Sequence, residues 1–232
     1  MQFIEKNSFN VRSAVYSLKK DGSALEFLLF PMIHVGSPQF YEEISRRLAS
    51  CDLILAEGVK SRRGNVLTLS YRIVRHIRRM ELVTQHDGMR LESFRGKILN
   101  ADIDGAAFDE RWSSLPTSLR AQLIVLVPIF VAYLFLFGTR ETLAENLALD
   151  DLPSDDEILS DDEDFEPLNS LIIDERDRIL IEHVARLEDQ QNGARQIAIV
   201  YGARHMRNTI RFLMQKLNYR IAKAEWVKVF DL

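Results

Sequence analysis

The sequence predicts an α/β fold with a mixed, mostly parallel central sheet flanked by helices, an antiparallel N-terminal hairpin and a helical insertion. Three observations support this class: an alternating N-terminal segment, a strand–helix–strand unit that follows it, and a second strand–helix pair near the C-terminus. With 232 residues the chain can bury one sizeable core. We therefore expect a single α/β domain over residues 1–232, with a helical, apolar and acidic insertion over residues 105–168.

The N-terminal hairpin is indicated by alternation and by a turn. Residues 11–18 alternate apolar and polar side chains, as a half-buried strand does. Residues 19–23 contain Asp-Gly, which is typical of a tight turn, and residues 25–30 form the return strand.

A strand–helix–strand unit is predicted next. The apolar run at residues 28–30 ends the first strand, and residues 52–56 form a short buried second strand. Between them, Ser37 and Pro38 are typical of a helix N-cap followed by proline at the first helical position.

Polar side chains follow three predicted strands. His34 comes after the first strand of the unit, Glu57 comes after the second, and His205 follows a strand at residues 196–201. Parallel strands deliver their carboxyl ends to the same edge of a sheet, where open α/β sheets bind ligands. We expect the three side chains to converge. His205 also begins a helix, whose positive end disfavours the imidazolium form and so suits a metal ligand or general base.

Arg176 is predicted to point inward. The helix over residues 169–189 has one stripe at three- and four-residue steps, formed by Ile173, Arg176, Leu180, Val184 and Leu187. A buried guanidinium keeps its charge and needs a carboxylate or a ligand anion, and Glu57 is the expected partner. The alternative is that Arg176 extends to water at the border of the stripe.

Three acidic or amide residues lie near the exit of a strand predicted within residues 96–104. Asn100, Asp102 and Asp104 fit two interpretations. They suit groups that support a metal site or bind the metal, and they suit a strand-to-helix turn rich in Asx residues.

Composition excludes several classes of function. The net charge of −4 gives no electrostatic reason to expect a nucleic-acid partner. Cys51 is the only cysteine, so an intramolecular disulfide and a cysteine-based zinc site are excluded. The N-terminal residues lack the pattern of a secretory signal, and we expect a cytoplasmic protein.

The basic cluster within residues 67–80 suits a solvated helix face or a face for phosphate or an acidic partner, and the acidic run at residues 150–166 suits an exposed loop.

Residues 121–138 form an uncharged apolar segment of about the length of a membrane span. Pro128 interrupts it, and Arg120 and Arg140 flank it. A single crossing would separate His205 from the other candidate site residues. We expect burial in the protein or in a dimer interface; membrane association through 121–138 and a true span are the alternatives.

Four short motifs occur in an order that resembles a known family. They are His34 with Gly36, the strand end Ala56-Glu57-Gly58-Val59, the helix segment Asp174-Glu175-Arg176-Asp177, and Tyr201-Gly202-Ala203-Arg204-His205-Met206. Together they resemble the TraB/PrgY/TIKI family, within the wider group that includes erythromycin esterase and the haem-binding protein ChaN. The family is marked by two Gly-x-x-His motifs and an acidic residue; Pro31 stands in place of the first glycine here.

The resemblance implies a metal-dependent, peptidase-like hydrolase. TIKI members are metal-dependent peptidases, and TraB and PrgY are membrane proteins that limit peptide-pheromone signalling. By analogy His34, Glu57 and His205 would hold a divalent ion, manganese or cobalt, that activates water and polarises a carbonyl group. Glu57 would alternatively act as the base, and Arg176 would orient Glu57 or stabilise an oxyanion.

The expected partner is a peptide or small-molecule substrate, and we expect a homo-oligomer. The alternative function is a non-catalytic peptide- or haem-binding regulatory protein, associated with a membrane through the apolar segment.

Overall fold

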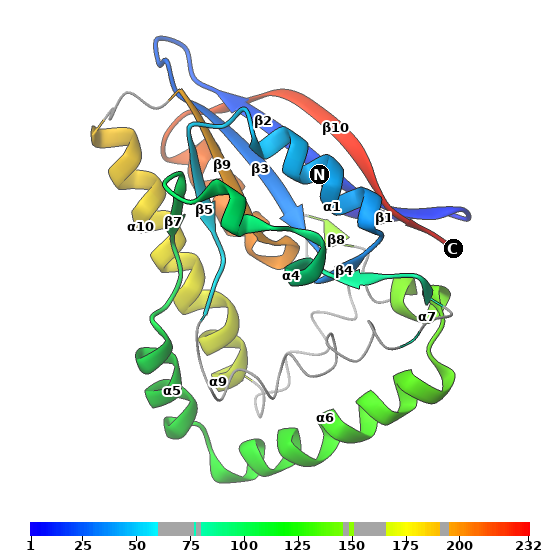
Figure 1. Ribbon diagram of the computed structural model, residues 1–232. Helices are drawn as coiled ribbons and strands as arrows, with labels where there is room; N and C mark the ends of the chain where they lie inside the picture. The colour runs from blue at the N-terminus through cyan, green and yellow to red at the C-terminus, as the bar shows by residue number, and fades with distance from the viewer. Residues whose placement is uncertain (60–76, 78–79, 146–148, 151–165, 191–194) are drawn as a thin grey trace.

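The computed structural model describes residues 1–59, 77, 80–145, 149–150, 166–190 and 195–232, and it confirms the α/β class (Figure 1). The strands of the main sheet are β1 (Gln2–Lys6), β2 (Asn10–Lys19), β3 (Glu26–Met32), β5 (Leu53–Ala56), β7 (Ile98–Asn100), β8 (Leu149–Asp150), β9 (Gln196–Gly202) and β10 (Arg220–Asp231). Their order is β7-β5-β9-β3-β2-β1-β8, and β10 pairs with β2. The four strands β7, β5, β9 and β3 pair in parallel, and these strands carry the candidate site.

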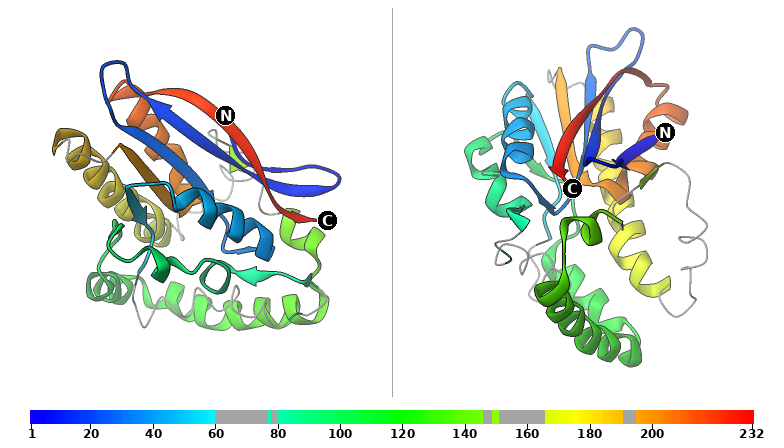
Figure 2. Two further views of the ribbon diagram at one scale, coloured as in Figure 1. Left: turned by 45° about the horizontal axis from the view of Figure 1, so that its top comes forward. Right: turned by 90° about the vertical axis from the view of Figure 1, so that its right-hand side faces the viewer.

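Helices cover both faces of this sheet. Helix α1 (Pro38–Leu48) lies on one face, and α10 (Glu175–Gln190) and α11 (Met206–Gln215) lie on the other (Figure 2). The remaining described elements are β4 (Val35–Gly36), β6 (Val83–Thr84), α4 (Gln85–Gly88), η2 (Leu91–Phe94), α5 (Gly105–Ser114), α6 (Thr117–Phe137), α7 (Arg140–Glu145), α9 (Glu166–Asn169), the π-helical turn η3 (Ser170–Asp174) and the short helix η4 (Ala203–His205).

The N-terminal hairpin is present as predicted. Strands β2 and β3 are antiparallel, with Tyr16 opposite Leu29 and Lys19 opposite Glu26. Strand β1, which was not predicted, extends this antiparallel part. At the other end of the chain, β10 is one strand with two bulges.

The strand–helix–strand unit is also confirmed. The Ser37 hydroxyl accepts a hydrogen bond from the Phe40 amide at 3.2 Å, and Pro38 begins α1, so the cap forms where the sequence predicts it. Helix α1 buries Phe40, Tyr41, Ile44 and Leu48 against the sheet. Cys51, just after this helix, is fully buried, and burial raises the pKa of its thiol to about 11.

Two apolar clusters stabilise the fold. The main cluster lies between the sheet and its covering helices. A second, smaller cluster lies under the insertion and joins α5, the start of α6, α9 and η3; it consists of Ile103, Phe108, Trp112, Leu115, Leu119, Leu168 and Leu171. Helix α5, at the start of the predicted insertion, therefore packs with the π-helical turn that precedes α10.

Helix α6 is mostly exposed in the part of the chain that the structure describes, so the expected burial within the protein is wrong there, and burial in a dimer interface stays a prediction. It is one continuous helix that includes Pro128, and 11% of its most apolar window is buried, with a mean hydropathy of 2.2 there. In the described part of the chain it is the helix that is long and apolar enough to cross a membrane. Figure 1 shows α6 set apart from the sheet, with few described elements packed against it.

Two further predictions concern residues 67–80 and 150–166. Apart from residues 77, 80, 150 and 166, these segments lie outside the described residues. The short strand β6 follows the first of them.

Candidate functional site

The three predicted site residues follow three neighbouring parallel strands. Strand β9 lies between β5 and β3, with Met32 opposite Gly202 and Ala56 opposite Val200. Glu57 follows β5, His34 follows β3, and His205 ends the short helix after β9. The sheet order therefore brings the three segments to the same edge, as the sequence predicts.

Glu57 is held by a side chain on one oxygen and by the backbone on the other. Arg176 Nη2 donates to Glu57 Oε1 at 2.6 Å, and the Gly202 amide donates to Glu57 Oε2 at 2.7 Å. The Glu57 amide donates to the Val200 carbonyl at 3.1 Å, which fixes its backbone to β9. The carboxylate thus has one orientation and keeps lone pairs for a further donor.

Arg176 lies inside the protein, as the apolar stripe of its helix predicts, and it bridges two carboxylates. Besides Glu57, it contacts Asp102 through Nε at 2.8 Å and through Nη2 at 2.7 Å. The Asp102 side chain is fully buried and also accepts from the amides of Gly58 and Ile103 at 2.9 and 2.8 Å. This geometry is the bidentate pairing that guanidinium groups make best.

The charges around Glu57 keep it ionised. Burial raises the pKa of this carboxyl, but the electrostatic influence of Arg176, together with smaller contributions from His34 and His205, outweighs that effect and lowers the pKa to about 2. Burial lowers the pKa of Arg176, but Asp102 and Glu57 outweigh that effect and raise it. At neutral pH, Glu57 is therefore a fixed negative charge.

His205 is oriented by a carboxylate that the sequence did not single out as a site residue. Its Nδ1 lies 2.6 Å from Asp177 Oδ1, and both side chains are about 4% exposed. Asn208 Nδ2 donates to the second Asp177 oxygen at 2.5 Å. A carboxylate at Nδ1 favours the tautomer with hydrogen on that nitrogen, which leaves Nε2 to accept a proton or bind a ligand.

Gly202 separates Glu57 from His205 at close range. A Cβ atom built on Gly202 would lie 3.2 Å from Glu57 Oε2, 3.4 Å from His205 Cδ2 and 3.9 Å from His205 Nε2. The carboxylate and Nε2 thus approach the same small space above the backbone of Gly202. An alanine here would press on the Glu57 carboxylate and would meet the His205 ring at van der Waals contact.

Tyr201 supports the two halves of the site. Its hydroxyl donates to the Ala101 carbonyl at 3.1 Å, and its buried ring meets the His205 ring edge-on with centroids 5.0 Å apart. The Arg176 guanidinium lies 5.7 Å from the centre of the same ring. Burial raises the pKa of Tyr201 well above its usual range, so the phenol stays neutral.

His34 lies at the partly exposed side of the site. Its Nδ1 lies 3.3 Å from Gln85 Oε1, and its carbonyl accepts from the Gln85 amide at 2.8 Å. Gln85 is brought there because β4, just after His34, pairs with β6. His34 also lowers the pKa of the Glu57 carboxyl, so it lies within electrostatic range of that group.

The predicted metal ligands fit a divalent ion only in part. The Asp177–His205 pair is the arrangement that metal-binding histidines usually have. Glu57, however, already has a donor on each oxygen. No group of three or more His, Cys, Asp or Glu side chains among the described residues is arranged to hold a metal ion. A bound divalent ion therefore stays a proposal.

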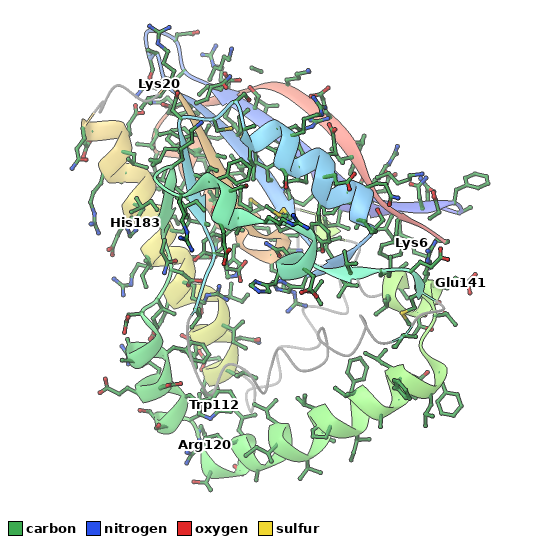
Figure 3. The ribbon with its side chains drawn as sticks, in the orientation of Figure 1. Lys6, Lys20, Trp112, Arg120, Glu141 and His183 are labelled. Atoms are coloured by element: carbon green, nitrogen blue, oxygen red, sulfur yellow. The ribbon has the colours of Figure 1, made fainter. Side chains whose placement is uncertain are left out.

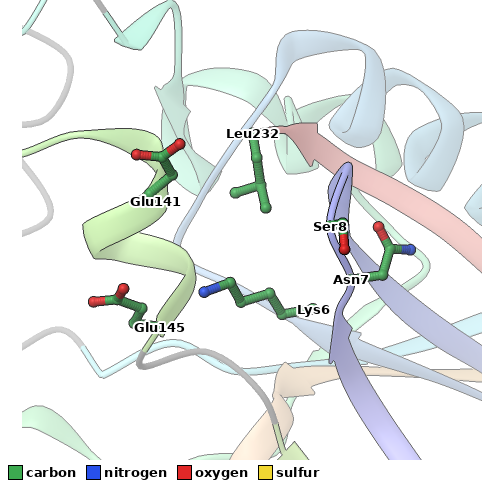
Figure 4. Close-up of a pocket in the computed structure, with 6 residues that line it drawn as sticks. All are labelled: Lys6, Asn7, Ser8, Glu141, Glu145 and Leu232. Carbon is green, nitrogen blue, oxygen red and sulfur yellow. The ribbon is translucent and has the colours of Figure 1, made fainter.

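Two surface cavities lie away from these residues. One, with a volume of about 540 Å³, is lined by Lys6, Asn7, Ser8, Glu141, Glu145 and Leu232. In Figure 4 the Lys6 side chain extends toward α7, which carries the two glutamates. The other, of about 630 Å³, lies over β2, β3 and β10 and has acidic and basic residues at its rim. Neither contains a candidate site residue.

The sequence indicated some of the supporting residues and missed others. Asp102 pairs with Arg176, whereas Asp104 caps α5 by accepting from the Ala106 amide at 2.8 Å, as in an ordinary turn. Asn100 donates to the Gly58 carbonyl at 3.2 Å. Asp177 was visible only as a neighbour of Arg176, and its pairing with His205 required knowledge of how α10 and α11 pack.

Comparison with known proteins returned no match among protein-family models, curated proteins or solved structures.

Proposed function

We propose that this chain is a hydrolase of the TraB/TIKI type, acting on a peptide or amide bond at the site formed by His34, Glu57, Arg176 and His205. The observation that carries the proposal is the buried Asp177–His205 pair at 2.6 Å, with His205 Nε2 and the Glu57 carboxylate both within 4 Å of the Cβ position on Gly202. A carboxylate-oriented imidazole next to a fixed charge at the edge of a parallel sheet is the arrangement that general-base catalysis needs.

In this proposal His205 Nε2 takes a proton from the attacking water. The charge that develops on the imidazole is stabilised by Asp177 and by the nearby Glu57 carboxylate. The protonated imidazole then donates its proton to the leaving amine, and the carboxyl product forms. His34 supplies the second imidazole, which binds the polar group of the substrate from the exposed side.

Glu57 serves better as a fixed charge than as the base. A carboxylate with a pKa of about 2 is a poor proton acceptor at neutral pH. Its bonds to Arg176 and Gly202 instead hold it for electrostatic stabilisation. Arg176 uses Nε and Nη2 on Asp102 and Glu57, so it acts by orienting Glu57.

A divalent ion, manganese or cobalt by analogy, stays part of the proposal. If bound by His34, Glu57 and His205 Nε2, it would lower the pKa of a bound water and polarise the carbonyl group. The chain's own residues keep the roles given above: Asp177 holds the His205 ring, and Arg176 holds Glu57.

The test uses purified wild type, His205→Ala and Glu57→Gln. Each is dialysed briefly against mixed divalent ions, analysed for metal content, and assayed against a fluorogenic peptide library. Activity in the wild type that both variants lose supports the hydrolase, and stoichiometric metal lost in His205→Ala assigns the ion. Activity that persists in His205→Ala, or no hydrolysis by any folded preparation with or without metal, contradicts the proposal.

A second candidate is a non-catalytic peptide- or haem-binding regulatory protein associated with a membrane. The exposed apolar helix α6 favours it, because a cytoplasmic enzyme does not need such a surface. Haem and peptide titrations of the wild type, followed by absorbance and fluorescence, separate this candidate from the hydrolase. A homo-oligomer stays a prediction, and sedimentation analysis tests it.

A further inference from the structure

Helix α6 exposes an unusual amount of apolar surface. Nine large hydrophobic side chains on it are between 47% and 65% exposed: Ile124, Val125, Leu126, Ile129, Phe130, Tyr133, Phe135, Leu136 and Phe137. A soluble monomer rarely leaves a continuous patch of this kind in water. All nine side chains lie on one helix, so a single apolar environment has to cover them.

The exposed residues extend around most of the helix. At 100° per residue they cover about two thirds of the circumference. The remaining narrow stripe faces the rest of the chain: Leu123, Val127 and Val131 are half-buried along it, and Leu134 and Gly138 are buried. A helix that docks in a protein groove needs one apolar stripe, whereas a helix that is apolar on most sides fits hydrocarbon.

Charge is arranged at the two ends of the helix. From residue 121 to residue 139 no charged residue occurs, and Arg120 and Arg140 flank this stretch. Arg120, at the N-terminal end, suits the anionic headgroup level of a bilayer, whereas the Arg140 side chain is held by the domain itself. Tyr133 and three phenylalanines add aromatic side chains of the kind that gather near this level.

Both ends of α6 are attached to the same folded domain. At the N-terminal end, Leu115 and Leu119 belong to the second apolar cluster with Trp112, and Figure 3 shows Trp112 and Arg120 at the corner between α5 and α6. At the C-terminal end, Arg140 donates to the carbonyl groups of Met80 and Asp231 at 2.7 and 3.0 Å. Ala144 of α7 lies in the main core.

These attachments decide how the helix meets a membrane. A 21-residue helix is about 31 Å long, enough to cross a bilayer, but crossing would require its two ends to lie on opposite sides. Here both ends are fixed to one domain, so the helix lies along the membrane.

We propose that α6 is a membrane-binding helix that inserts lengthwise into one leaflet of a phospholipid bilayer, with both of its ends and the whole domain on the same side of the membrane. The proposal is independent of the proposed hydrolase activity.

The first test is flotation of the full chain with phosphatidylcholine vesicles, with and without phosphatidylglycerol. The wild type should float with the vesicles. A triple variant, Val125→Gln, Ile129→Gln and Leu136→Gln, should lose roughly tenfold or more in partitioning, since each of these exposed side chains would otherwise enter hydrocarbon. Because all three are more than half exposed, the variant should keep the wild-type circular dichroism spectrum and thermal midpoint.

A matched control makes the same change to exposed apolar residues elsewhere, in Phe9→Gln, Met214→Gln and Trp226→Gln. It should float like the wild type. An equal loss of vesicle partitioning in both triple variants would show nonspecific hydrophobic adsorption and overturn the proposal. A wild type that does not float, but forms a dimer that the α6 variant dissociates, would assign the surface to a second copy and also overturn it.

The second test determines orientation. Ser113→Cys and Thr139→Cys, just outside the two ends of α6, are made separately in a Cys51→Ala background. Each protein is bound to preformed vesicles and treated from outside with a membrane-impermeant maleimide. Labelling of both positions supports lengthwise insertion, and protection of either position until detergent is added indicates a span and refutes it.

Discussion

The pairing of Asp177 with His205 gives the sharpest prediction for this molecule, through the substitution Asp177→Asn. The carboxylate accepts from His205 Nδ1 at 2.6 Å and from Asn208 Nδ2 at 2.5 Å. Asparagine has one acceptor oxygen and keeps one of these bonds. The other partner then faces an amide NH₂ group, so one buried charge-assisted bond is lost without replacement.

The expected cost to stability is about 2 kcal/mol, since a hydrogen bond to a charged group contributes roughly 1.5–3 kcal/mol when its partner is removed. The expected cost to hydrolysis is about 10²–10⁴-fold in kcat, because the variant no longer favours the tautomer with hydrogen on Nδ1 and no longer stabilises the imidazolium. Urea unfolding measures the first quantity, and a peptide assay measures the second.

Nitrogen-15 NMR of the histidine rings measures the tautomer directly, with His205→Gln assigning the signal. The wild type should show hydrogen on Nδ1, and Asp177→Asn should show a mixture. Asp174→Asn is the matched control, because Asp174 is an exposed residue of the preceding π-helical turn; its stability should change by less than about 0.5 kcal/mol. An unchanged tautomer and unchanged stability in Asp177→Asn would refute the reasoning.

Three further predictions concern Arg176, Glu57 and Gly202. Arg176→Leu should cost about 3–5 kcal/mol in urea unfolding, because it leaves Asp102 buried without its cation; a cost below 1 kcal/mol would show that the pair is solvated. The folded-state pKa of Glu57, about 2, lies below its ordinary value of 4.5, so this group stabilises the fold fully above pH 4.5 and loses about 3 kcal/mol as the pH falls toward 2. Glu57→Gln should remove that part of the acid unfolding curve, and identical curves for the two proteins would contradict the assignment. Gly202→Ala should lower activity far more than stability, because the new methyl group would lie 3.2 Å from the Glu57 carboxylate and 3.4 Å from the His205 ring; wild-type kcat/KM in this variant would rule out the close approach.

Local signals predicted most of the parallel part of the fold. The cap at Ser37 and Pro38 and the strand before Glu57 depend on neighbouring residues, so the sequence shows them directly. Strand β1 is short and lacks clear alternation, and it forms because β2 pairs with it. Strand β10 is continuous because pairing with β2 holds it through its two bulges.

The site was predictable where one helical stripe or one strand end marked it. His34, Glu57, Arg176 and His205 all follow such a signal. Asp177 does not, because it lies 100° around the helix from Arg176 and is buried only where α10 packs on α11. The exposure of α6 was not predictable either. An apolar sequence indicates an apolar environment, but it does not show whether a protein core, an interface or a membrane provides that environment.

The two anchors of the site are consecutive residues of one helix. Arg176 fixes Glu57 and Asp177 fixes His205, so a rotation or a slide of α10 along its axis displaces the fixed charge and the imidazole together. The two groups therefore cannot be adjusted separately by moving this helix. The turn that precedes α10 is π-helical and packs in the apolar cluster that also contains the N-terminal end of α6. A displacement of that end of α6 would therefore be transmitted through α10 to Glu57 and His205, and both groups would move together.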